Sequence, residues 1–252
     1  MKVLFALLLS FSTPLLALGQ EMSPQPRWLI DAPTAGLLPR GSFNIDFRFY
    51  EQNGLLAQFE IGVFNQAMIG FSFGGQDIVG NEAVKWNPKV EFSARIRVID
   101  EGISSPAVAA GYQSQGPGAY SEADSLKRYA TKSKGLYVVV SKNFGSAMGD
   151  VGVHAGVNRS LEDADGDGDF SGFVGIDKSL GQDISVVAEY DFALNDNEDN
   201  TLGSGKGFLN LGGRWALSRK LAIEVDIKNI FQDGSRNPYP DRELRILFFE
   251  EF

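Results

Sequence analysis

The chain contains no cysteine and only one histidine, His154. Without cysteine there can be no disulfide, thiol catalysis, Cys-ligated zinc or iron–sulfur cluster. After residue 18 no apolar run approaches the ~20 residues that a membrane-spanning helix needs. Basic residues are also scarce, at 23 against 32 acidic residues, which gives a net charge of −9. Nucleic acid is therefore not expected as a partner, because its binding depends on Lys and Arg neutralising phosphates.

The N-terminus has the pattern of an export signal. Met1-Lys2 provides a short positive start, residues 3–18 are largely apolar, and Ala17-Leu18-Gly19 supplies small residues for cleavage before Gln20. We therefore predict a signal peptide over residues 1–19; the alternative, an uncleaved anchor, fits less well because the run is short and no positive stop follows it. Residues 20–40 contain four prolines and are predicted to be an irregular leader in the periplasm.

Apolar and polar residues alternate through most of the remaining chain, as expected for strands with one oily and one polar face. The clearest segment places Val90, Phe92 and Ala94 on one parity and Glu91 and Arg95 on the other. Twelve such segments are expected, near residues 43–49, 57–63, 69–73, 89–98, 106–113, 136–143, 151–158, 170–178, 184–194, 209–217, 221–228 and 242–252. Those at 106–113, 136–143 and 170–178 are weakly patterned, so ten or fourteen strands remain open.

Connection lengths alternate as well. The joins after the third, fifth, seventh, ninth and eleventh segments are long, and those after the even-numbered segments are short; only Asn53-Gly54, a hairpin turn, is short on the long-loop side. Outer-membrane barrels have an even strand number, short periplasmic turns and long external loops. The predicted fold is therefore all-β: a single antiparallel transmembrane β-barrel of about twelve strands over residues 41–252. The alternative is a soluble sandwich, in which the mid-strand charges would all face bulk water.

Four stretches, at residues 33–42, 133–143, 175–179 and 188–191, resemble the YjbH-like family of outer-membrane barrels. The resemblance spans most of the exported chain, and none of its motifs is catalytic. It implies a protein of the bacterial outer membrane, and in some relatives a link to exopolysaccharide export. It also implies that Phe248 and Phe252 form the C-terminal signal read by the barrel-insertion machinery, although Glu250 occupies a position that is usually apolar.

One loop has the spacing of a calcium site. Asp163, Asp165 and Asp167 follow the D-x-D-x-D-G pattern that opens an EF-hand loop, and alternate carboxylates can converge on one hard cation. The twelfth position is Val174, so the bidentate ligand is missing. The competing interpretation is a solvated acidic hairpin, and apart from this Ca²⁺ loop no cofactor is predicted.

A mixed set of charges is predicted to face the barrel lumen. His154 falls on the polar parity, where a hydrogen-bonded lumen residue is expected; a barrel hydrolase of lipase or protease type is the alternative for this residue. The predicted lumen-facing polar residues are Arg95, Arg97, His154, Glu189, Asp191, Arg214, Glu224, Asp226 and Lys228. Such charges could pair and fill a narrow lumen, or line a path for polar solutes.

The function predicted from these patterns is a non-enzymatic outer-membrane barrel, either structural or a narrow polar conduit, linked to exopolysaccharide export. Outer-membrane lipid, the insertion machinery, and polysaccharide or small polar solutes are the predicted partners. Two alternatives belong to other classes: the barrel hydrolase already named, and a secreted, soluble glycan-binding β protein.

Overall fold

The structure is a computed structural model that describes residues 26–146, 149–234 and 239–252. The predicted signal peptide at residues 1–19 lies outside these residues and stays a prediction. Within the described ranges, no helix is long and apolar enough to cross a membrane.

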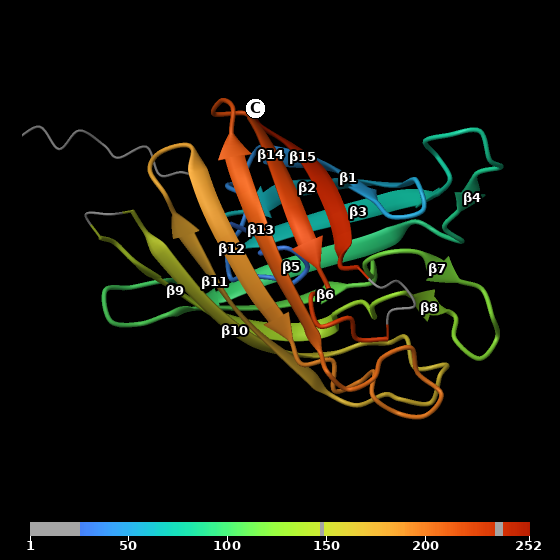
Figure 1. Cartoon of the computed structure of the whole chain (residues 1–252). Coiled ribbons are helices and arrows are strands. Elements are labelled where there is room, and N and C mark those ends of the chain that lie inside the picture. The colour runs from blue at the N-terminus through green and yellow to red at the C-terminus, as the bar shows by residue number, and fades with distance from the viewer. Residues whose placement is uncertain (1–25, 147–148, 235–238) are drawn as a thin grey trace, which may run out of the picture.

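Twelve antiparallel strands close into a barrel, as predicted (Figure 1). Each strand pairs with its neighbours in chain order, and β1 pairs with β15 to complete the ring. The barrel strands are β1 Ser42–Tyr50, β2 Gly54–Phe64, β3 Ala67–Gln76, β5 Glu91–Ile99, β6 Ala107–Gln113, β9 Gly135–Phe144, β10 Val151–Arg159, β11 Ser171–Ser179, β12 Ile184–Asp191, β13 Phe208–Ala216, β14 Leu221–Lys228 and β15 Asp241–Glu251. Closure leaves no free sheet edge, which rules out the soluble sandwich.

All the long connections lie at one end of the barrel, as the alternation of loop lengths predicts (Figure 1). Three two-residue strands lie at this loop end: β4 Lys85–Trp86, which extends the sheet beside β3, and the pair β7 Tyr120–Ser121 and β8 Arg128–Tyr129. The short turn between β1 and β2 is the exception. Gln52 and Asn53 both have positive φ there, at 58° and 52°, which tightens the turn.

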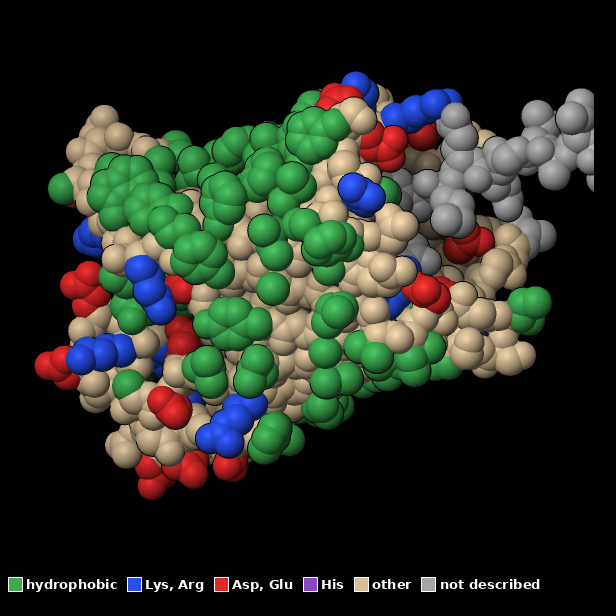
Figure 2. Space-filling model, turned by 180° about the vertical axis from the view of Figure 1, so that it is seen from behind, with side chains coloured by type: hydrophobic (Ala, Val, Ile, Leu, Met, Phe, Trp, Pro, Cys, Tyr) green, Lys and Arg blue, Asp and Glu red, His purple; other side chains and the backbone are tan. Residues whose placement is uncertain are grey.

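The outer wall is apolar and the inner wall is polar. Phe92 is 61% exposed and Val225 is 56% exposed, while their neighbours Glu91 and Glu224 are 2% and 0% exposed. Figure 2 shows hydrophobic side chains spread over the wall, with charged side chains gathered toward the ends. An apolar exterior suits hydrocarbon, and the closed sheet pairs the strand backbones with one another as a lipid environment requires.

Aromatic rings form a row across β15, β1, β2 and β3 on this outer wall. The ring of Phe43 lies 5.2 Å from that of Phe252 and 6.3 Å from that of Phe248, and on its other side it stacks on Phe59 at 5.7 Å. Phe59 in turn stacks on Phe71 at 5.2 Å. Phe248 and Phe252 therefore face outward; their role as an insertion signal stays a prediction.

The N-terminal leader differs from the sequence expectation. Residues 20–40 were expected to be irregular and periplasmic, but residues 27–38 fold into the lumen, and all residues from 28 to 38 are buried. This segment, called the plug below, begins as a hairpin: Trp28 pairs with Pro33, and the Leu29 N–H donates to the Ala32 carbonyl at 2.9 Å. The prolines do prevent a regular strand, but the barrel supplies hydrogen-bond partners for the irregular backbone.

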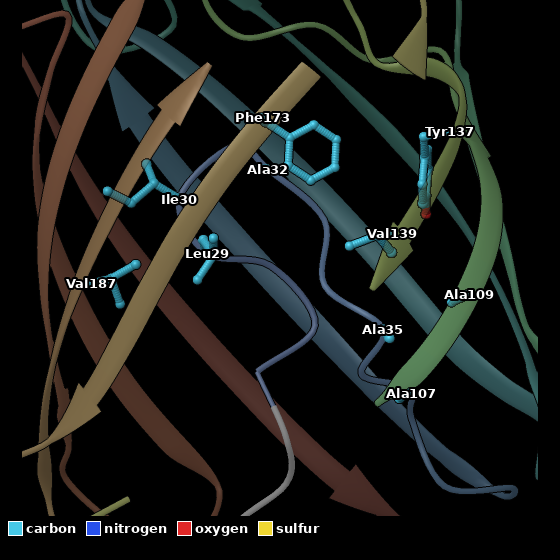
Figure 3. Close-up of a cluster of buried hydrophobic side chains, with 10 residues drawn as sticks. All are labelled: Leu29, Ile30, Ala32, Ala35, Ala107, Ala109, Tyr137, Val139, Phe173 and Val187. Atoms are coloured by element: carbon cyan, nitrogen blue, oxygen red, sulfur yellow. The ribbon is translucent and has the colours of Figure 1, made fainter. Parts of the chain in front are cut away.

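The plug packs most of its apolar side chains on one part of the lumen wall (Figure 3), and Leu37 and Leu38 form a second cluster with Met68 of β3. The cluster joins four plug residues to inward-facing residues of β6, β9, β11 and β12, namely Leu29, Ile30, Ala32, Ala35, Ala107, Ala109, Tyr137, Val139, Phe173 and Val187. This explains why three segments were weakly patterned: their inward positions carry apolar residues as well. The lumen wall is thus apolar where β6, β9 and β11 face the plug and charged along β1, β13, β14 and β15, and the plug contacts both parts.

Candidate functional site

The tip of the plug is held by one carboxylate. Glu189 on β12 accepts hydrogen bonds from the backbone N–H groups of Ile30, Asp31 and Ala32, at 2.9 to 3.0 Å. The Asn210 side chain donates to the same carboxylate at 2.7 Å. Three consecutive peptide N–H groups converging on one anion form a strong, charge-assisted contact in a buried setting.

Five arginines hold the plug by its carbonyl oxygens. The guanidinium groups of Arg48 and Arg245 donate to the Ile30 carbonyl, at 2.6 and 3.3 Å. Arg95 donates to the carbonyls of Arg27 and Gly36, both at 2.8 Å. Arg97 reaches the Ala35 carbonyl at 2.9 Å, and Arg214 the Leu29 carbonyl at 3.4 Å. The barrel therefore binds the backbone of the plug more than its side chains.

Three of these arginines, Arg48, Arg214 and Arg245, are also paired with lumen carboxylates. Arg245 donates to Glu224 at 2.6 Å and also binds Asp46, while Arg214 pairs with Glu224 from the other side. These groups lie in the lumen of β1, β13, β14 and β15, with side chains at most 20% exposed. A buried ion pair compensates part of the desolvation cost of its charges, so this half of the lumen is a filled, salt-bridged interior.

Asp31, at the plug tip, joins this network. Its carboxylate accepts from Arg48 at 2.8 Å and lies 2.7 Å from the Lys228 ammonium. Lys228 also donates to Glu243 at 3.1 Å. Nearby, Lys134 pairs with Asp191, one of the predicted lumen residues. All of these groups lie close to the loop end of the lumen.

One lumen carboxylate has no such compensation. Asp226 on β14 is 0% exposed, and neither of its side-chain oxygens has a hydrogen-bond partner among the described residues. It faces the lumen between Glu224 and Lys228, as its parity predicts.

His154 lies between two polar side chains of the neighbouring strands. Its Nδ1 is 2.8 Å from the Ser141 hydroxyl on β9, and its Nε2 is 2.8 Å from an Asp177 oxygen on β11. A carboxylate accepts the Nε2 proton, which leaves Nδ1 to accept from the serine. The Ala35 N–H of the plug donates to the same hydroxyl at 2.8 Å. The structure therefore places His154 in a hydrogen-bonded chain that ends on the plug.

Above the plug tip, a cavity of about 120 Å³ opens toward the loop end. We call it the vestibule. Its wall is rich in carboxylates and amides, with Tyr50 and Phe208 as aromatic surfaces. Asp31 forms part of its floor, so anything that enters from the loop end meets the plug.

The loops beyond the vestibule are joined by a buried ion cluster. Arg128, which is 0% exposed, donates to Asp196 at 2.6 and 2.7 Å and to Asp165 at 2.9 Å. Burial alone would lower the pKa of Arg128, but the hydrogen bonds to Asp196 and Asp165 outweigh it and raise that pKa. Lys132 adds a second cation, 2.8 Å from Asp165. Three long loops, at residues 114–134, 160–170 and 192–207, are thereby tied together.

This cluster also bears on the predicted calcium loop. Asp163 is exposed, whereas Asp165 and Asp167 are buried, so the three carboxylates do not converge. No group of three or more His, Cys, Asp or Glu side chains suited to a metal ion occurs in the described parts of the chain. Arg128 and Lys132 supply the positive charge that a cation would bring. The structure therefore does not support the calcium interpretation.

The structure places all nine predicted lumen residues on the inner wall. Among the described residues, eight of them have a hydrogen bond to the plug, an ion-pair partner or both, and Asp226 has neither kind of bond. The sequence did not reveal that most of these residues hold the plug, because their hydrogen bonds go to backbone groups of a segment that was predicted to be irregular. It also missed Ser141, Asp177 and Arg128. The alternating parity of β9 and β11 could have identified the first two as inward-facing, whereas no pattern singled out Arg128.

The fold and lumen define a β-barrel of the outer-membrane type. The sequence matches no known protein-family model and no curated protein. Among solved structures, the chain is similar to a KdgM porin, with a TM-score of 0.51, 10% identity, and coverage of 84% of this chain and 99% of that chain. A KdgM porin in complex with disordered oligogalacturonate gives a TM-score of 0.52 at 11% identity, with the same coverage. At these identities the likeness concerns the fold.

Proposed function

We propose that the protein is a non-enzymatic conduit of the bacterial outer membrane whose lumen is closed by its own N-terminal plug. The apolar outer wall and the porin-like fold support the location. The polar vestibule above the plug supports entry of solutes from the loop end. We further propose that export through the predicted signal peptide and insertion through Phe248 and Phe252 bring the chain there.

The plug is the observation that carries this proposal. A purely structural barrel could fill its interior with side chains alone. Here a separate segment is bound through its peptide groups, and the wall donors that hold it would face an open polar path without it. Residues 28–38 are all buried by these contacts, so a conduit with this plug seated is closed.

The solute class proposed is saccharide. Hydroxyl and carboxylate groups of sugars accept from the same guanidinium donors that now hold carbonyl oxygens. The similar KdgM porin bound to oligogalacturonate supports a sugar chain as the kind of molecule such a barrel admits. The resemblance to YjbH-like proteins supports an exopolysaccharide as its source.

Planar-bilayer conductance tests the conduit. A variant that lacks residues 26–38 is expected to carry an ion current well above that of the full mature chain. Heat-modifiable gel migration of both proteins would show that each barrel is closed. A folded variant without current would contradict the conduit and leave a structural barrel.

One observation favours a second candidate function, that of a hydrolase. The side chains are hydrogen-bonded in series, with Ser141 placed as a nucleophile, His154 as its general base and Asp177 as the carboxylate that orients the histidine. Ser141 is 4% exposed and already accepts the Ala35 N–H, so the plug would have to leave before a substrate could reach it. A fluorophosphonate probe, applied to the variant without residues 26–38 and to its Ser141→Ala form, decides the matter. Labelling of the first alone would favour the hydrolase.

A further inference from the structure

The plug covers Asp226, the lumen carboxylate without a hydrogen-bond or ion-pair partner among the described residues. Asp226 is opposite Gly212 in the sheet, and a Cβ atom built on Gly212 would lie 2.2 Å from an Asp226 oxygen and 3.2 Å from Ile30 Cδ1. The Ile30 side chain and the Asp226 carboxylate therefore share the space above Gly212. An apolar side chain next to a buried carboxylate excludes water from it.

The nearby guanidinium groups act on Asp226 only through their charge, because their hydrogen bonds go to other acceptors. Arg245 binds Asp46, Glu224 and the Ile30 carbonyl, and Arg48 binds Asp31 and the same carbonyl. The charged groups that act most strongly on Asp226 are Glu224 on its own strand, Glu243 and Arg245 on β15, and Arg48 on β1. Two further cations on this face are engaged elsewhere: Lys228 pairs with Asp31 and Glu243, and Arg214 of β13 pairs with Glu224. The plug contributes Ile30 and β13 contributes Gly212, neither of which carries a charge.

A buried carboxylate without a partner is much more costly as an anion than as an acid. We propose that Asp226 holds a proton while the plug is seated and releases it when the plug leaves, so that closure of the lumen takes up one proton. The inference rests on the proposed role of the plug as the closing element. The proton is bound on one Asp226 oxygen and passes to water when Ile30 no longer covers the site.

The sign of the effect follows from linkage. Once the plug has left, Asp226 is hydrated and ionises at a lower pH than it does beneath the plug, because water stabilises its anion. Above that pH the open form has lost its proton while the closed form still holds one. Rising pH therefore favours the open form, by about tenfold per pH unit for one proton, until the closed form also ionises.

Hydrogen exchange of the plug amides measures this equilibrium in the full mature protein in detergent micelles. The quantity needed is the protection factor of residues 30–32, corrected at each pH for the intrinsic exchange rate. In the parent protein it is expected to fall with rising pH more steeply than in Asp226→Asn, by about tenfold per pH unit at the steepest point. Because Glu189 is present in both proteins, its own titration cancels in the comparison.

A second pair of variants covers the case in which Asp226→Asn does not fold. Ile30→Ala uncovers Asp226 and is expected to flatten the pH dependence. Leu29→Ala loosens the plug on the apolar wall near Gly175, away from Asp226, and is expected to keep the dependence. Parallel pH curves for parent and Asp226→Asn, or equal slopes for the two alanine variants, would overturn the inference. Because exchange requires no ion current, a non-conducting truncated barrel would refute the conduit without deciding this point.

Discussion

Both carboxylate oxygens of Glu189 lie 3.0 Å from the backbone nitrogen of Asp31, and Asp31 in turn pairs with Arg48 and Lys228. A wall residue thus holds the peptide group of the plug tip, while the side chain of that tip is held by two other wall residues. The contact joins β12 to β1 and β14 through a segment that belongs to none of them. Seating of the plug therefore stabilises the barrel as well as closing it.

Glu189→Gln should loosen the plug. Glutamine retains one carbonyl oxygen, but its NH₂ group meets N–H donors, so at least one buried donor loses its acceptor. Each such loss costs about 1–3 kcal/mol. The protection of residues 30–32 against hydrogen exchange should fall accordingly, whereas Glu122→Gln, at an exposed loop position, should leave it unchanged. Undiminished protection in Glu189→Gln would show that the carboxylate does not hold the tip.

Arg128→Met should release the loops. The substitution leaves Asp165 and Asp196 buried with their main cation removed, a loss of about 3–5 kcal/mol for a buried pair. Limited proteolysis of the folded barrel should then cut within residues 114–134, 160–170 or 192–207. Lys127→Met is the matched control, because the side chain of Lys127 is 56% exposed and pairs with the exposed Asp124. Equal resistance of the two variants to proteolysis would show that Arg128 does not hold the three loops together.

Calcium should not bind specifically at the acidic loop. Because Asp165 is already paired with Arg128 and Lys132, titration calorimetry with Ca²⁺ should give the same heats for the parent and for Asp163→Ala/Asp165→Ala. A saturable heat that only the parent shows would restore the calcium interpretation.

Glu162 should make the loop packing sensitive to pH. It accepts from the backbone N–H groups of Tyr129 and Ser133, but burial outweighs these bonds and raises the pKa of Glu162. The packed form therefore binds the proton more tightly than the open form. The contribution of Glu162 to loop stability should be fully present below the ordinary Glu pKa of about 4.3 and be lost as pH rises through the higher value of the packed form.

The rate of proteolysis across this pH range measures the effect, after correction with an unfolded substrate of the same protease. Glu162→Gln removes the titrating group and should flatten the curve. A parent protein whose corrected rate falls as pH rises would have the opposite sign from the one expected.

The barrel was predictable from sequence because lipid imposes a simple rule on every strand. Phe92 and Val225 face outward and Glu91 and Glu224 face inward, as alternation requires. Strand number and the side of the long loops followed from the same periodicity. Phe173 shows where the rule weakens: it points into the lumen because the plug gives it an apolar neighbour.

The plug could not be predicted in this way. Its contacts run from wall arginines to backbone carbonyls, which every residue type carries, so residue identity gives no signal. The four prolines within residues 20–40 correctly excluded a regular strand, but they did not show where the segment lies. The pairing of Arg128 with Asp165 joins loops 37 positions apart, and no local pattern encodes such a contact.

Disulfide formation between the plug and the wall tests the central claim most directly. The chain has no cysteine, and a Cβ built on Gly175 would lie 2.3 Å from Leu29 Cδ1, so the Leu29 side chain lies directly against this wall position. Leu29→Cys/Gly175→Cys, oxidised as a folded barrel in bacterial outer membranes, should yield the cross-linked peptide pair by mass spectrometry. Leu29→Cys/Val174→Cys should yield none, because Val174 faces outward. A folded barrel that cross-links at neither position, or at Val174 instead, would contradict the account.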